Sequence, residues 1–232
     1  MRLTGFFHQF RVFFLHGLLA EKTDLERIVS PILFAVTMML VFSFAVGEVD
    51  PSIKAKIYLA QTFVTALLAL QLSFSRIFEP DRHDRVFDQI RTYPIHAPAW
   101  YTAKYVLVLT LGSSTLLPTM FFGAFLNQTE KNPLFSWSVV LVGLLALGGL
   151  AAIGVLLATM TLKAQSRQIL YPILYFPLTT PVLLAAVNAS EMILQDSAIN
   201  ERSMPWLWLL MGFDLIYITL GVLIYPELIE EG

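Results

Sequence analysis

Six apolar stretches dominate the sequence, and each approaches or exceeds the length that a helix needs to cross a lipid bilayer. A helix spans about 30 Å of hydrocarbon with about 20 apolar residues. The stretches cover residues 28–46, 57–74, 105–126, 137–160, 169–187 and 205–225. Only 14% of the 232 residues are charged, against about 25% in ordinary soluble domains. We therefore predict an all-α integral membrane protein with six transmembrane helices.

The distribution of Lys and Arg predicts how these spans are oriented. Eleven of the fifteen basic residues lie before the first span, between the second and third, or between the fourth and fifth. Loops rich in Lys and Arg stay in the cytoplasm. We therefore expect a multi-pass protein of the plasma membrane with both termini, and the loop between spans two and three, in the cytoplasm.

Residues 1–27 precede the first span and are predicted to form an interfacial amphipathic helix. Leu and Phe recur there every three or four residues, but His8, Arg11 and Glu21 interrupt them. Such a helix is too charged to span and lies in the headgroup plane. The alternative is a helix packed on a soluble core, but the sequence offers no soluble domain to receive it.

The loop between spans two and three, Arg76 to Lys104, is the most highly charged segment. Eight residues from Arg76 to Arg91, both included, carry formal charge. Each would cost about 2.5–3.5 kcal/mol at the centre of a membrane helix. The segment must therefore lie at a membrane face, and we expect it to contain a short cytoplasmic helix that meets a soluble partner.

Composition and motifs exclude several classes of function. There is no cysteine, so disulfides and thiolate metal sites are excluded. A net charge of −2 argues against a nucleic-acid partner. No phosphate-binding loop is present, because the nearest glycine spacing, Gly149 to Gly154, lies inside a span. No catalytic constellation stands out, so the chain is not predicted to be an enzyme, and any ATP is bound by another chain.

The four histidines all fall on the predicted cytoplasmic side, and no metal site is predicted from them. His8 and His16 stand eight residues apart on the first helix and could ligate a metal or haem. Solvated surface histidines are far commoner, and we prefer that interpretation.

Asp214 is the one ionisable residue deep within an apolar span. An acid at that depth is a candidate functional residue, because the free-energy cost of burying its charge in the bilayer must be offset by a partner or by protonation. The alternative is a structural hydrogen bond, most plausibly to Gln61, Thr62 or Thr65 of the second span. We favour the structural role.

The fifth span contains three prolines, Pro172, Pro177 and Pro181. Each removes a backbone donor and clashes with the preceding turn, so the helix is predicted to be kinked or broken. A static kink and a joint between two moving segments both remain open. In the fourth span, small residues predict close helix packing, within or between subunits, at the pairs Gly148/Ala152 and Gly154/Ala158.

Residues of the charged loop and of the fifth span together resemble the CcmB family, the membrane subunit of the cytochrome c maturation ABC transporter. Two departures are Arg85, where glycine is usual, and Asp88, where glutamate is usual. The matching residues are Arg76, Phe78, Glu79, Asp81, Asp84, Gln89, Ile90, Pro94, Ala103, Lys104, Pro177, Leu178, Thr179 and Pro181.

The resemblance implies a single ABC-2-type transmembrane domain over residues 1–232, in a bacterial inner membrane. Its implied partners are a cytoplasmic ABC ATPase subunit, haem-handling membrane subunits and a second copy of the chain. No bound cofactor is predicted, and haem enters only as the transported or handled species. The residues expected to couple to the ATPase are Glu79, Asp81, Arg82, Asp84, Arg85 and Asp88.

Two other functions are compatible with the same spans. One is an ABC-2 permease that exports a lipid or a polysaccharide. The other is a membrane assembly scaffold that transports nothing.

Overall fold

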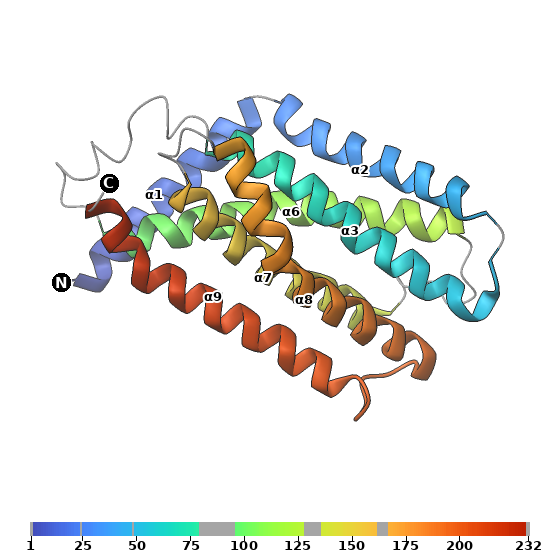
Figure 1. Cartoon of the computed structure of the whole chain (residues 1–232). Coiled ribbons are helices and arrows are strands. Elements are labelled where there is room, and N and C mark those ends of the chain that lie inside the picture. Colours follow the sequence, from blue (N-terminus) through green and yellow to red (C-terminus); the bar gives the residue numbers. More distant parts are fainter. Residues whose placement is uncertain are drawn as a thin grey trace.

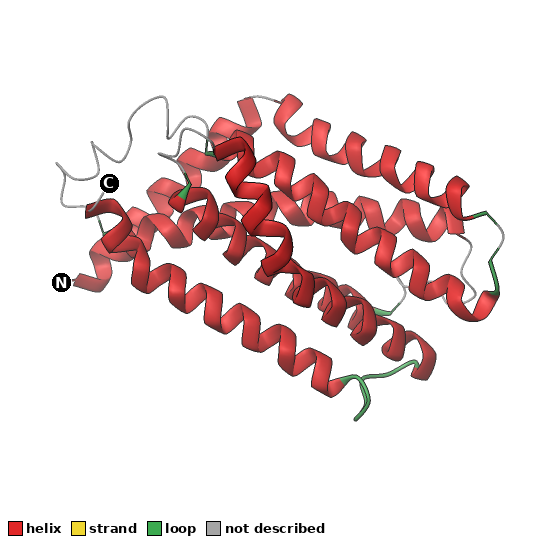
Figure 2. Ribbon diagram, in the orientation of Figure 1, coloured by secondary structure: helices red, strands yellow, loops and turns green. Residues whose placement is uncertain are grey.

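The computed structural model describes residues 2–23, 25–47, 49–78, 96–127, 136–161 and 167–230. This part of the chain is helical and contains no strand (Figure 2). The predicted all-α fold is confirmed for these residues. The helices are α1 (Arg2–Thr23), α2 (Leu25–Val46), α3 (Pro51–Ile77), α6 (Ala97–Asn127), α7 (Trp137–Met160), α8 (Arg167–Asp196) and α9 (Met204–Glu230).

Six of these helices are long and apolar enough to cross a membrane, which confirms the six predicted spans. They cover Ile28–Val46, Ile53–Phe74, Ala97–Leu126, Trp137–Met160, Ile169–Asp196 and Met204–Glu227. Two helices extend beyond the predicted spans. Helix α6 begins at Ala97, before the predicted start of the third span at Tyr105, and its Lys104 lies over aromatic rings within the bundle. Helix α8 continues to Asp196, past the predicted end of the fifth span at Val187, and Ala189 and Ile193 are still buried.

Helix α7 occupies the centre of the bundle, with α3, α6, α8 and α9 packed against it (Figure 1). In its apolar window 83% of the residues are buried, against 17% in the first span and 11% in the sixth. Gly148, Ala152, Gly154 and Ala158 all belong to this buried set. The small-residue pairs therefore serve packing within the chain.

Helices α2 and α9 lie on opposite sides of the bundle in Figure 1. Both expose large apolar side chains, such as Phe44 on α2 and Leu215 on α9. Exposed side chains of this kind on a span face acyl chains or other membrane proteins. The outer faces of these two helices are therefore the main apolar surface of the bundle.

The two termini lie at the same end of the bundle (Figure 1), as predicted. The opposite end is fastened by polar contacts between α3 and α8 and by local hydrogen bonds before α9. Lys56 Nζ of α3 lies 2.7 Å from Glu191 Oε2 of α8. Before α9, the Asn200 side-chain oxygen accepts from the backbone N–H groups of Arg202 and Ser203, both at 3.1 Å.

The N-terminal segment forms a helix, α1, which packs along α6 and beside α2. The backbone N–H of His96 donates to Gln9 Oε1 at 2.8 Å, and Gly17 leaves room for Leu107. The face of α1 that is turned away from α6 exposes Phe7 and Leu19. The same face also exposes His8, Arg11 and His16, and that this helix lies in the headgroup plane stays a prediction.

Candidate functional site

The residues predicted to couple to an ATPase lie outside the described residues. These are Glu79, Asp81, Arg82, Asp84, Arg85 and Asp88. The loop is shorter than the predicted Arg76–Lys104, because α3 continues to Ile77 and α6 begins at Ala97. The two ends of this loop are described, and they meet.

Lys104 of α6 joins the two ends of the loop through aromatic rings. Its ammonium lies 5.3 Å from the ring centroid of Phe78, at the end of α3, and 5.2 Å from that of Trp100. The two rings are 6.4 Å apart and nearly perpendicular, at 67°. Both are buried. A cation over an aromatic face is worth about 0.5–2 kcal/mol, depending on desolvation, so this contact holds the start and finish of the loop together.

The same aromatic cluster continues to α9 through Tyr225. Its ring lies 5.3 Å from both Trp100 and Tyr101. The Tyr101 hydroxyl donates to the backbone oxygen of Tyr217 at 3.5 Å, and a side chain on Gly221 would overlap the Tyr101 ring. Displacement of the loop ends would therefore act directly on α9.

Sequence reasoning missed this aromatic joint, which we define as Phe78, Trp100, Tyr101, Lys104 and Tyr225. The available signal was local. Trp100 and Lys104 stand four residues apart, so they share one face of a helix directly after the charged loop.

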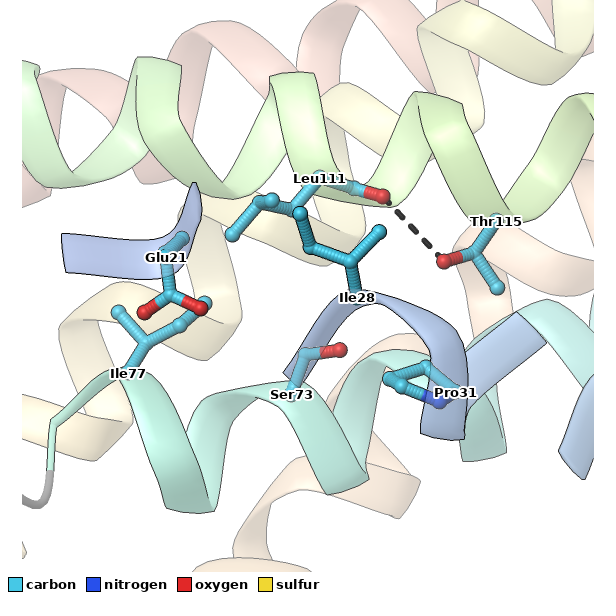
Figure 3. Close-up of a pocket in the computed structure, with 7 residues that line it drawn as sticks. All are labelled: Glu21, Ile28, Pro31, Ser73, Ile77, Leu111 and Thr115. Atoms are coloured by element: carbon cyan, nitrogen blue, oxygen red, sulfur yellow. Dashed lines mark hydrogen bonds between the residues drawn. The ribbon is translucent and has the colours of Figure 1, made fainter. Parts of the chain in front are cut away.

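A small pocket lies where α1, α2, α3 and α6 meet (Figure 3). Glu21 lines it and is only 4% exposed. The Ser73 and Thr115 hydroxyls donate to backbone oxygens of their own helices, at 3.2 and 3.3 Å. The space holds about one water molecule, so it is a packing junction and not a substrate site. Its lining residues are Glu21, Ile28, Pro31, Ser73, Ile77, Leu111 and Thr115.

Asp214 lies against α7, and the predicted partner in the second span is wrong. A Cβ on Gly148 would lie 2.9 Å from Oδ2 of Asp214, and one on Gly149 would lie 2.7 Å from Oδ1. The Tyr105 hydroxyl of α6 lies beside the same position, 3.4 Å from the Gly148 Cβ point. Two consecutive glycines bring the backbone of α7 close enough for the carboxyl group to rest on it.

The three prolines of the fifth span do not break it, because α8 runs continuously from Arg167 to Asp196. Figure 1 shows the helix changing direction in the half that contains them. Neighbouring groups hold this half together. The Thr179 hydroxyl donates to the Tyr175 carbonyl at 2.8 Å, and the Tyr175 hydroxyl donates to Leu150 of α7 at 3.3 Å. The predicted break is wrong, and the predicted kink agrees with the bend.

These features define a polytopic α-helical membrane protein with a charged loop fastened at one end of its bundle. Residues 9–230 match the family model described as CcmB protein. The chain belongs to the CcmB family, as its resemblance indicated.

Three relatives share the name "Heme exporter protein B". The one from Escherichia coli strain K12 is 31% identical over 182 residues, which cover 78% of this chain and 80% of that protein. The relative from Rhodobacter capsulatus is 30% identical over 152 residues, which cover 65% of this chain and 68% of that protein. The relative from Haemophilus influenzae is 29% identical over 165 residues, which cover 71% of this chain and 73% of that protein.

Proposed function

We propose that this chain is the permease subunit of an ABC transporter complex for cytochrome c maturation, with haem as the species that the complex exports or handles. The observation that carries this proposal is the family match over residues 9–230, together with relatives named as haem exporters. The match argues against the two alternatives, a lipid or polysaccharide permease and a scaffold that transports nothing.

The proposal assigns ATP hydrolysis to a separate cytoplasmic subunit, because the sequence has no phosphate-binding loop. The charged loop is the proposed docking segment. Glu79, Asp81, Asp84 and Asp88 would meet basic groups of the ATPase, and Arg82 and Arg85 its acids. Complementary charges of this kind set orientation and register more than affinity.

The aromatic joint provides the route from the loop into the bundle. Lys104 contacts Phe78 at one end of the loop and Trp100 at the other, and Tyr225 continues the contact to α9. Nucleotide-driven movement of the docked loop would therefore reach α3, α6 and α9 together. The bent α8 packs beside α9 and would move with it.

The remaining parts of the proposal concern placement and partners. The excess of Lys and Arg around the termini and the charged loop supports a cytoplasmic position for them in a bacterial inner membrane. The complex would contain haem-handling membrane subunits and a second copy of this chain. The outer faces of α2 and α9 offer apolar surface for such neighbours.

The test replaces Glu79, Asp81 and Asp84 together by alanine. These acids lie outside the apolar spans in the sequence, so the variant should insert at wild-type level and yet lose co-purification with the ATPase subunit. The matched control replaces three acids between the spans predicted to face the other side of the membrane, Glu48, Asp50 and Glu130, and should still co-purify with the ATPase subunit. If the loop variant is expressed at the wild-type level and still co-purifies with the ATPase subunit, the loop is not the docking segment.

A further inference from the structure

Asp214 occupies a position in the bundle that suits a neutral acid better than a carboxylate. It lies eleven residues into α9 by its number in the sequence, about 15 Å along a helix that begins at Met204. Its Oδ1 is buried and has no hydrogen-bond partner among the described residues. The carboxyl group rests on Gly148 and Gly149, near the middle of the central helix α7.

Among the residues that the structure describes, the groups that face Asp214 offer no positive charge. On α7 the two glycines have no side chains, and on α8 the neighbour is Val182. The titratable groups nearby are phenols, Tyr105 on α6 and Tyr217 one turn along α9. Lys104, next to Tyr105 in sequence, lies over Phe78 and Trp100 instead.

Backbone donors cannot replace the missing cation. The N–H groups of Gly148 and Gly149 lie in the interior of α7, where each already bonds to a carbonyl four residues earlier. A carboxylate can only accept hydrogen bonds, whereas a protonated carboxyl has an O–H to donate. The carbonyl oxygens of α7 and the Tyr105 hydroxyl are the acceptors within its surroundings.

We propose that Asp214 is a proton-binding site inside the membrane, covered on its Oδ1 side by the Gly148–Gly149 notch of α7. The bound proton makes the carboxyl neutral and lets α9 rest on α7. Loss of the proton leaves a charge that has no cation to pair with at this depth, so proton release favours movement of α9 away from the notch. This inference is independent of which molecule the protein transports.

The first test uses dicyclohexylcarbodiimide, an apolar reagent that modifies protonated carboxyl groups in membranes. In the full complex near neutral pH, mass spectrometry should find Asp214 modified about tenfold or more faster than Glu191. Glu191 is the internal control, because its side chain pairs with the Lys56 ammonium at 2.7 Å. In the Asp214→Asn variant, modification of residue 214 should vanish, while modification of Glu191 should be unchanged.

Infrared spectroscopy gives a second measurement that needs no variant. Wild-type protein carrying carbon-13 in its aspartate side chains should show the shifted carbonyl band of a protonated acid at neutral pH. Carboxylate bands alone would overturn the proposal, as would failure of the reagent to distinguish Asp214 from Glu191.

Two glycine variants test whether α7 closes the site. Gly149→Ala places a Cβ 2.7 Å from Oδ1 and should displace the carboxyl group, which raises its rate of modification severalfold. Gly212→Ala, also near Asp214 but with nothing within 4 Å of its Cβ, should leave the rate unchanged. Equal rates in both variants would contradict closure by the notch.

Discussion

Gly154 of α7 tests whether the centre of the bundle is packed as tightly as the structure indicates. A Cβ at this position would overlap the Phe74 ring of α3. The ring is 1% exposed and is held by Tyr171 and Tyr175 of α8, at centroid distances of 5.9 and 5.7 Å. Because the ring has no free space on its other side, Gly154→Ala forces α7 and α3 apart.

The expected magnitude follows from two opposing effects. Overpacking a well-packed core costs about 1–3 kcal/mol, while exchanging glycine for alanine in a helix stabilises it by about 1 kcal/mol. Gly212→Ala in α9 is the matched control, because its Cβ meets nothing within 4 Å. It shows the helix effect alone, so the two variants should differ by about 1–3 kcal/mol in free energy of unfolding.

The assay is equilibrium unfolding in mixed detergent micelles, followed by circular dichroism. A second substitution, Phe74→Leu, should relieve the overlap, so that the double variant is more stable than the two single effects predict, by about 0.5–3 kcal/mol. Equal stability of Gly154→Ala and Gly212→Ala would refute the reasoning, because it would mean that α3 can retreat from α7 without cost.

Two further substitutions concern charged groups at opposite ends of the bundle. Lys104→Met should lower the unfolding free energy by about 1–2 kcal/mol, because it removes the cation from Phe78 and Trp100. Lys104→Arg keeps a cation at this position and should lose only a small part of that free energy. Equal losses in the two Lys104 variants would argue against the cation–π contact. Lys56→Ala should cost at most about 1 kcal/mol, because the Lys56 side chain is 48% exposed. The loss should shrink at high salt; a loss that does not depend on salt would exclude an ion pair.

The spans could be predicted because length and hydropathy alone decide which segments cross a bilayer. The full lengths of the helices could not be predicted, because polar residues near a membrane face depend on neighbours. Lys104 is accommodated in α6 by aromatic rings, and Glu191 is accommodated in α8 by Lys56 of α3. Neither neighbour can be recognised from hydropathy.

The environment of Asp214 shows a different limit. Hydropathy identifies an acid within a span, but it does not say which helices are adjacent. The polar second span was therefore wrongly predicted to provide the hydrogen-bond partner of Asp214. Gly148 and Gly149 carried a usable signal, because consecutive glycines in a helix permit close approach. The charged loop was singled out by composition, and its coupling residues stay predictions.

The packing of α1 along α6 also affects how the chain is assembled during synthesis. Gln9 contacts the backbone of His96, which is 87 residues later in the sequence. At about 5–20 residues per second, the ribosome needs about 4–17 s to make that stretch. Throughout this time α1 has no α6 to pack on, although α2 and α3 are already available for insertion. Helix α1 therefore reaches its final position only after the third span has been synthesised.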